Sequence, residues 1–208
     1  MRIDFWNRLV YYMLMKTTNA KQALLAAGKE LIWEKGYTAT GIQDILHVAN
    51  IPKGSFYHYF ASKDALVLAV VESYFQDFNT HAGHYLDDES LTPLTRLRRH
   101  FEAAGQWFES FSSYRGCMLG NLIQELAAHH EVFRGRFRGL LEQWRSSLVH
   151  CLRQAQDGGE LPVQQSVDQV ADFCISGFQG ALLVMKVSQS PAPLHAFLTM
   201  LFEVVLKG

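Results

Sequence analysis

The most constraining feature of the chain is the stretch 38–64, TATGIQDILHVANIPKGSFYHYFASKD, where two short apolar patterns flank a turn signal. In the first pattern the apolar side chains recur at i, i+3, i+4 and i+7, which predicts a short amphipathic helix: Ile42, Ile45, Leu46 and Ala49. Thr40 as N-cap and Gln43 three residues later fit a capping box. Asn50 and Pro52 then predict the end of this helix and a tight turn.

The second pattern, from Lys53 to Phe60, predicts another short helix. It places Phe56, Tyr59 and Phe60 inward. A helix of about two turns is not stable alone in water, so its aromatic side must be buried and its polar side presented outward. The outward set, which contains the candidate contacts to a DNA major groove, is Lys53, Gly54, Ser55, Tyr57, His58 and Lys63.

The segments 38–46 (TATGIQDIL) and 52–66 (PKGSFYHYFASKDAL) together resemble the N-terminal domain of the TetR family of transcriptional repressors. In that family the Gly, aromatic, Tyr, aromatic, Phe, x, Ser, Lys pattern marks the recognition helix and the start of a long connecting helix. The resemblance implies that matching positions touch DNA, mostly at phosphates, and these positions are Thr40, Lys53, Ser55, Tyr57, His58 and Lys63.

The remaining sequence predicts an all-α protein of about nine helices. Only five of its 208 residues are proline, helix-period segments are long, and no strand run with a hairpin turn occurs. We expect a three-helix helix-turn-helix DNA-binding domain over 16–64 and a helical regulatory and dimerisation domain over 65–208. The helix that starts after Ser62 is expected to run to about Tyr85 and to connect the two.

Cysteine usage favours a cytoplasmic protein, and the TetR resemblance implies a bacterial one. The net charge is −1, but residues 16–66 carry six lysines and four acidic side chains, so a mildly cationic head precedes an acidic body. Three cysteines without metal-ligand spacing fit reduced thiols, and we expect neither a metal nor a cofactor.

The first fifteen residues, MRIDFWNRLVYYMLM, form an N-terminal extension that departs from the family pattern. Their apolar part is too short to span a bilayer and lacks a signal-peptidase site, so we expect no membrane association. Two explanations stay open. The extension is either an over-called start or a helix that packs on the DNA-binding head.

Two strongly apolar helices are predicted at the end of the chain, Val167–Val187 and Pro193–Leu206. Their apolar faces are wider than a single helical bundle needs, and Gly177 and Gly180 predict a close backbone approach. The resemblance implies that these helices pair with their copies in a homodimer. A two-fold dimer fits a palindromic operator, whose half-sites lie about 34 Å apart.

A repressor needs a site for a signal, and RGCMLGN at 115–121 is the strongest candidate in the body. Cys117 lies beside Arg115 and near a helix start, where the helix dipole and free N–H groups stabilise a thiolate. The segment resembles the TetR subgroup of the N-ethylmaleimide reductase repressor, a sensor of electrophiles and oxidants. That resemblance implies that Lys186 lies near the thiol; alternatively Cys117 is a small buried hydrophobe and Lys186 extends into water.

Two other functions remain open. The aromatic residues of the body predict a pocket for a reversibly bound apolar effector of the repressor: Trp107, Phe108, Phe111, Phe137 and Trp144. An enzyme with Cys117 as nucleophile would need a histidine base and an orienting group, and no local sequence supplies them. We therefore expect a DNA-binding regulator and not an enzyme.

Overall fold

The computed structural model describes residues 20–111 and 113–207, and within them it has nine α-helices and no strand. This confirms the all-α prediction. The chain divides into two compact units, an N-terminal unit that ends at Glu72 and a C-terminal unit that begins at Ser73. The domain boundary predicted after Asp64 stays a prediction. The division between the two units falls within a single helix, Lys63–His81. The extension 1–15 lies outside the described residues.

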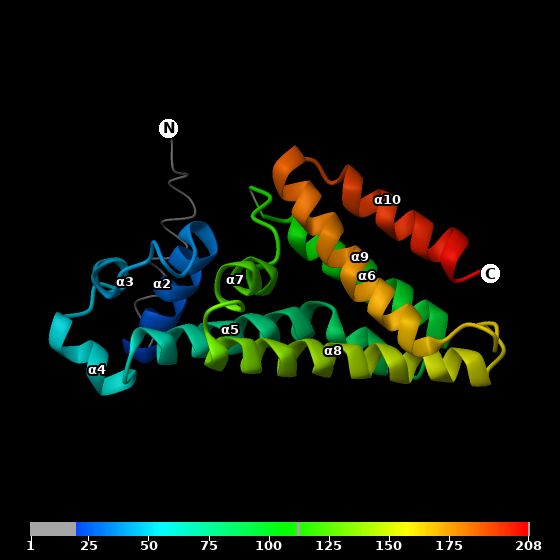
Figure 1. Cartoon of the computed structure of the whole chain (residues 1–208), viewed down its shortest axis with the longest axis horizontal. Helices are drawn as coiled ribbons and strands as arrows, with labels where there is room; N and C mark the ends of the chain where they lie inside the picture. Colours follow the sequence, from blue (N-terminus) through cyan, green and yellow to red (C-terminus); the bar gives the residue numbers. More distant parts are fainter. Residues whose placement is uncertain (1–19, 112, 208) are drawn as a thin grey trace. The chain divides into compact units, whose positions relative to one another are not determined.

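The N-terminal unit is a small helical domain (Figure 1), and its interior is apolar. Its core side chains come from every helix of the unit and include Leu24, Ile32, Ile45, Phe56 and Leu66. Its elements in chain order are α2 (Ala20–Lys35), α3 (Ile42–Ala49), the 3₁₀ turn η1 (Lys53–Ser55), α4 (Phe56–Tyr59) and the first part of α5 (Lys63–His81).

Helix α3 is capped differently from the prediction. Its N-cap is Gly41, whose N–H donates to the Asp44 carboxylate at 3.0 Å. Thr40, the predicted cap, is only 1% exposed, and its hydroxyl donates to the carbonyl of Gly36 at 2.7 Å. Thr40 therefore satisfies a carbonyl left over at the end of α2. Asn50 ends α3 in the left-handed conformation, with φ of 53°, as predicted.

The C-terminal unit contains the rest of α5 and the remaining helices. The α-helix of α5 stops at His81, and a 3₁₀ segment takes the place of the helix predicted up to Tyr85. The elements that follow are η2 (Gly83–Asp87), α6 (Pro93–Glu109), α7 (Met118–Leu126), α8 (Glu131–Asp157), α9 (Val167–Ser188), α10 (Ala192–Met200) and a π-turn (Leu201–Val205).

Aromatic rings fill the interior of this unit. The Phe101 ring of α6 lies 5.4 Å from Phe178 of α9 and 6.3 Å from Trp144 of α8, measured between ring centroids. Gly177 faces the ring of Phe197, which lies 2.4 Å from where a Cβ would stand. The close approach predicted at Gly177 is thus made by a side chain of α10 and not by a second backbone.

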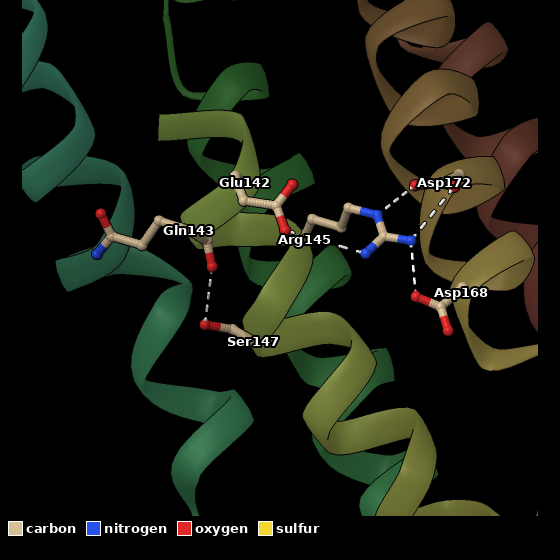
Figure 2. A network of polar contacts seen from close by, with 6 residues as sticks. All are labelled: Glu142, Gln143, Arg145, Ser147, Asp168 and Asp172. Atoms are coloured by element: carbon tan, nitrogen blue, oxygen red, sulfur yellow. Dashed lines mark hydrogen bonds and ion pairs between the residues drawn. The ribbon is translucent and has the colours of Figure 1, made fainter. Parts of the chain in front are cut away.

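A charged clamp fastens the start of α9 to α8 (Figure 2). The Arg145 guanidinium donates to Asp172 at 2.6 Å and to Asp168 at 2.8 Å. Helix α9 is long and apolar enough to cross a membrane by length and composition. However, Cys174, Phe178 and Leu182 on its inner face are buried in the protein core, as in a core helix of a globular protein.

Candidate DNA-binding and sensor sites

The η1–α4 segment presents the polar surface that the sequence predicts. Phe56 and Phe60 are buried, which fixes the rotation of this four-residue helix. Opposite them, Tyr57 is 64% exposed and its ring stands edge-on to Phe56 at 5.3 Å. Of the other predicted contacts in this segment, Lys53, Gly54 and His58 are exposed, and Ser55 is half-buried.

A hollow of about 410 Å³ adjoins this surface. The outer face of α3 forms one wall of the hollow and the turn before η1 forms the other. The lining residues are Gln43, Leu46, His47, Asn50, Ile51, Pro52 and Lys53. Amide, imidazole and ammonium groups in the lining give it hydrogen-bond donors, which are the groups that contact DNA phosphates.

Two of the predicted DNA-contact residues have partners inside the protein. The buried Thr40 hydroxyl bonds to the end of α2, as described above. Lys63 donates to the carbonyl of Tyr37 at 2.6 Å, and its ammonium lies 4.0 Å from the centre of the Tyr37 ring. The Tyr37 hydroxyl in turn donates to Asp64 at 2.6 Å. Both residues thus hold the DNA-binding domain together, whatever contact they make with DNA.

Cys117 is the N-cap of α7 and is 8% exposed. Three groups donate hydrogen bonds to its sulfur: the Tyr74 hydroxyl of α5 at 3.4 Å, the Gly120 N–H at 3.5 Å and the Gln179 side-chain amide of α9 at 3.5 Å. Donors that converge on one sulfur hold it as a hydrogen-bond acceptor. The fold thus adds side-chain donors from α5 and α9 to the cysteine that the sequence predicts at a helix start.

Lys186 lies beside this segment but directs its charge elsewhere. Its ammonium donates to the Asn121 side-chain oxygen at 3.2 Å, and its stem packs against Gly116, 3.3 Å from where a Cβ would stand. Asn121 donates to the carbonyl of Arg115 at 3.0 Å. The Arg115 guanidinium donates to Ser113 at 3.3 Å. The structure therefore brings Lys186 of α9 next to the segment that contains Arg115 and Cys117.

The two other thiols differ from Cys117. Cys151 and Cys174 are buried in the core, as predicted, and burial raises the pKa of Cys151 to about 11 and that of Cys174 to about 12. Both are therefore protonated near neutral pH. Within the described residues no cluster of three or more His, Cys, Asp or Glu side chains suits a metal ion.

The residues predicted to line an apolar pocket do not all pack on the same rings. Trp107 lies 5.1 Å from Phe108 and 5.5 Å from Phe111, and its ring also packs on Tyr74 at 5.4 Å. Trp144 packs on Phe101 and Phe178. Phe137, in contrast, stacks on Phe133 at 5.8 Å. Their role as a ligand pocket stays a prediction.

Sequence reasoning missed two residues of the cysteine site, Tyr74 and Gln179. Gln179 carried a usable signal, because it is an amide within the strongly apolar helix α9. Tyr74 carried a weaker one, since a tyrosine on an apolar helix face is as often simple core. Its hydroxyl contacts a residue 43 positions away, which the sequence alone does not place.

Two family models match the chain. Residues 24–70 match the model for bacterial regulatory proteins of the tetR family, and residues 93–201 match the tetracyclin repressor-like C-terminal domain. The transcriptional regulator AcuR of Cereibacter sphaeroides is 40% identical over 182 residues, which cover 86% of this chain and 81% of AcuR. The repressor DhaR of a Mycobacterium species is 34% identical, covering 92% and 95%.

A solved structure has the same fold. The crystal structure of the reduced form of Escherichia coli NemR superposes with a TM-score of 0.81 at 25% identity, covering 90% of this chain and 97% of that one. The helix-turn-helix geometry, the two family models and these relatives agree. The chain therefore belongs to the TetR family of bacterial regulatory proteins and is a transcriptional regulator.

Proposed function

We propose that this protein represses transcription as a homodimer and leaves its operator when an electrophile or oxidant modifies Cys117. The observation that carries the proposal is the convergence of three hydrogen-bond donors on the Cys117 sulfur. Each part of the proposal, DNA binding, pairing and sensing, has support in the structure.

DNA binding is assigned to the exposed side of η1 and α4. Lys53, Tyr57 and His58 are suited to phosphates, while Ser55 and the Gly54 backbone approach base edges. Apart from its chain neighbours, no described residue comes within 4 Å of where a Cβ of Gly54 would stand, so this backbone is open to a close partner. The burial of Phe56 and Phe60 keeps these groups on one face of the domain.

Pairing is assigned to the outer face of α9 and α10. This face, together with the π-turn that follows α10, exposes large apolar side chains in a row at helical spacing: Phe173, Leu183, Val184, Val187, Met200 and Val204. Gly180 lies within the row, and no other described part of the chain comes within 4 Å of its Cβ position. A contiguous exposed apolar surface is typical of a subunit interface, and a two-fold interface would set the distance between the two recognition helices.

Sensing is assigned to the thiol of Cys117. With an α,β-unsaturated aldehyde, the sulfur attacks the β-carbon, a carbon–sulfur bond forms, and the double-bond electrons move onto the carbonyl oxygen. The enolate then takes a proton at the α-carbon, so the thiol proton ends on carbon and no group leaves. The product is a thioether, which accepts hydrogen bonds poorly.

The test is a gel shift with DNA from upstream of the gene, with and without an α,β-unsaturated aldehyde. We expect the wild-type protein to release the DNA when treated, and Cys117→Ser to stay bound. The matched controls are Cys151→Ser and Cys174→Ser, which should respond like the wild type because those thiols are protonated. Release of the Cys117→Ser variant by the aldehyde would overturn the assignment of the sensor.

A second candidate is reversible binding of an apolar effector near Trp107. The half-buried rings of Trp107 and Phe111 favour it, because they lie at the edge of the aromatic cluster and contact each other at 5.5 Å. Under this alternative the Cys117→Ser variant would still respond to the natural effector.

A further inference from the structure

We propose that Tyr74 and Gln179 are positioning residues that hold the Cys117 sulfur as a hydrogen-bond acceptor and thereby set its reactivity. The inference rests on the proposed sensor function and deepens it. It assigns a task to two side chains from two different helices, α5 and α9, that the sequence analysis did not identify.

Every hydrogen bond at the sulfur is donated to it. The Tyr74 hydroxyl, the Gly120 N–H and the Gln179 amide all point toward the sulfur, at 3.4, 3.5 and 3.5 Å. Among the described residues, no group accepts a hydrogen bond from Cys117. A thiolate gains from all three donors, whereas the proton of a neutral thiol has no acceptor in this arrangement.

The Tyr74 hydroxyl is oriented so that its proton faces the sulfur. Its oxygen accepts a hydrogen bond from the N–H of Met118 at 3.3 Å, which directs the O–H toward Cys117. Burial and the neighbouring Cys117 raise the pKa of Tyr74 well above its ordinary value, so the phenol keeps its proton and stays a donor. The ring is fixed by the packing on Trp107.

Gln179 reaches the sulfur because residue 120 is a glycine. The side-chain oxygen of Gln179 lies 2.6 Å from where a Cβ of residue 120 would stand, so any larger residue would displace the amide. Gly120 thus donates its own N–H and leaves room for the second donor.

The charged groups near the site have other partners. Lys186 of α9 donates to Asn121, and Arg115 in the preceding loop donates to Ser113. On α5, Asp77 acts on Tyr74 and contributes to the rise in its pKa. The groups that contact the sulfur directly are therefore neutral donors, and the removal of one of them is a clean test.

The test measures how fast iodoacetamide alkylates Cys117 in the full-length protein, followed by mass spectrometry from about pH 6 to about pH 9. In this reaction a sulfur–carbon bond forms, the carbon–iodine bond breaks, iodide leaves and the thiol proton goes to the buffer. The variants are Tyr74→Phe and Gln179→Leu. The matched control is Gln143→Leu, which removes an exposed amide of α8, a helix that supplies no donor to the sulfur among the described residues.

We expect Tyr74→Phe and Gln179→Leu each to slow alkylation near pH 7 by about fivefold to tenfold, the effect of one hydrogen bond to an anion. Their rate profiles should also move to higher pH, while Gln143→Leu stays within about twofold of the wild type. A variant that only loosened the packing would change the rate by the same factor at every pH.

Wild-type profiles in both variants, or a uniform change of rate at every pH, would overturn the inference. A different result would contradict the proposed sensor function. The alkylated wild-type protein would then still bind its operator DNA, whatever the effect of Tyr74 and Gln179 on the alkylation rate.

Discussion

His100 shows how one buried side chain makes the stability of this protein depend on pH. The imidazole is fully buried, accepts a hydrogen bond from the Trp144 indole at 2.9 Å, and has its other nitrogen 3.0 Å from the carbonyl of Ala82. A ring that accepts at one nitrogen donates at the other, so the neutral form with its proton toward Ala82 satisfies both partners. A second proton would face the indole N–H.

We therefore expect stability to fall in acid. Burial lowers the pKa of His100 from 6.5 to about 4, so the unfolded chain binds more protons than the folded protein between these values. The free energy of unfolding should drop by about 3 kcal/mol as the pH falls from about 6.5 to about 4. Urea unfolding at several pH values measures this. The part of this slope that His100 contributes should be absent in His100→Asn and present when the exposed His150 is replaced by Asn.

At the scale of elements, α4 is a helix of four residues that exists only through its packing. Phe56→Ala should destabilise the N-terminal unit by about 3–5 kcal/mol and abolish operator binding, because it removes a fully buried ring. Tyr57→Ala, on the exposed face, should leave the melting temperature unchanged and weaken binding. Thermal unfolding and gel shifts separate the two effects. Equal losses of stability in both variants would contradict the assigned faces.

The helices themselves were predictable from sequence because their signals are local. Asn50 and Pro52 mark the end of α3, and the Phe56 and Phe60 spacing gives the buried side of α4. The cap of α3 was misplaced by one residue, since the sequence does not show that Thr40 is claimed by the carbonyl of Gly36. The end of α5 was placed too late, because the change to a 3₁₀ segment at Gly83 does not alter the apolar pattern.

The cysteine site was only half predictable for the same reason. Cys117 could be placed at a helix start from its neighbours in the sequence. Its two side-chain donors come from positions 43 and 62 residues away, and only the packing of α5 and α9 brings them to the sulfur. The predicted neighbour Lys186 does lie beside the segment, but its ammonium binds Asn121.

For the whole molecule, the exposed row on α9 and α10 should decide the oligomeric state. Val187 is 81% exposed within that row. Val187→Glu would place a charge in the paired apolar surface and should shift a dimer to monomers in analytical ultracentrifugation at micromolar protein, with loss of operator binding. Val163→Glu is the control, because Val163 is similarly exposed in the loop before α9 and lies outside the row. A dimeric Val187→Glu would refute pairing through this face.

Helix α9 carries Gln179, whose amide donates to the Cys117 sulfur, directly before Gly180, whose Cβ position has no neighbour within 4 Å among the described residues. If alkylation of Cys117 weakens pairing through α9, pairing must weaken alkylation to the same extent, because one coupling free energy links the two events. At a low protein concentration more of the protein is monomeric, so its Cys117 is more readily alkylated. A cell that makes few copies of this regulator would thus respond to a smaller dose of toxicant than a cell that makes many.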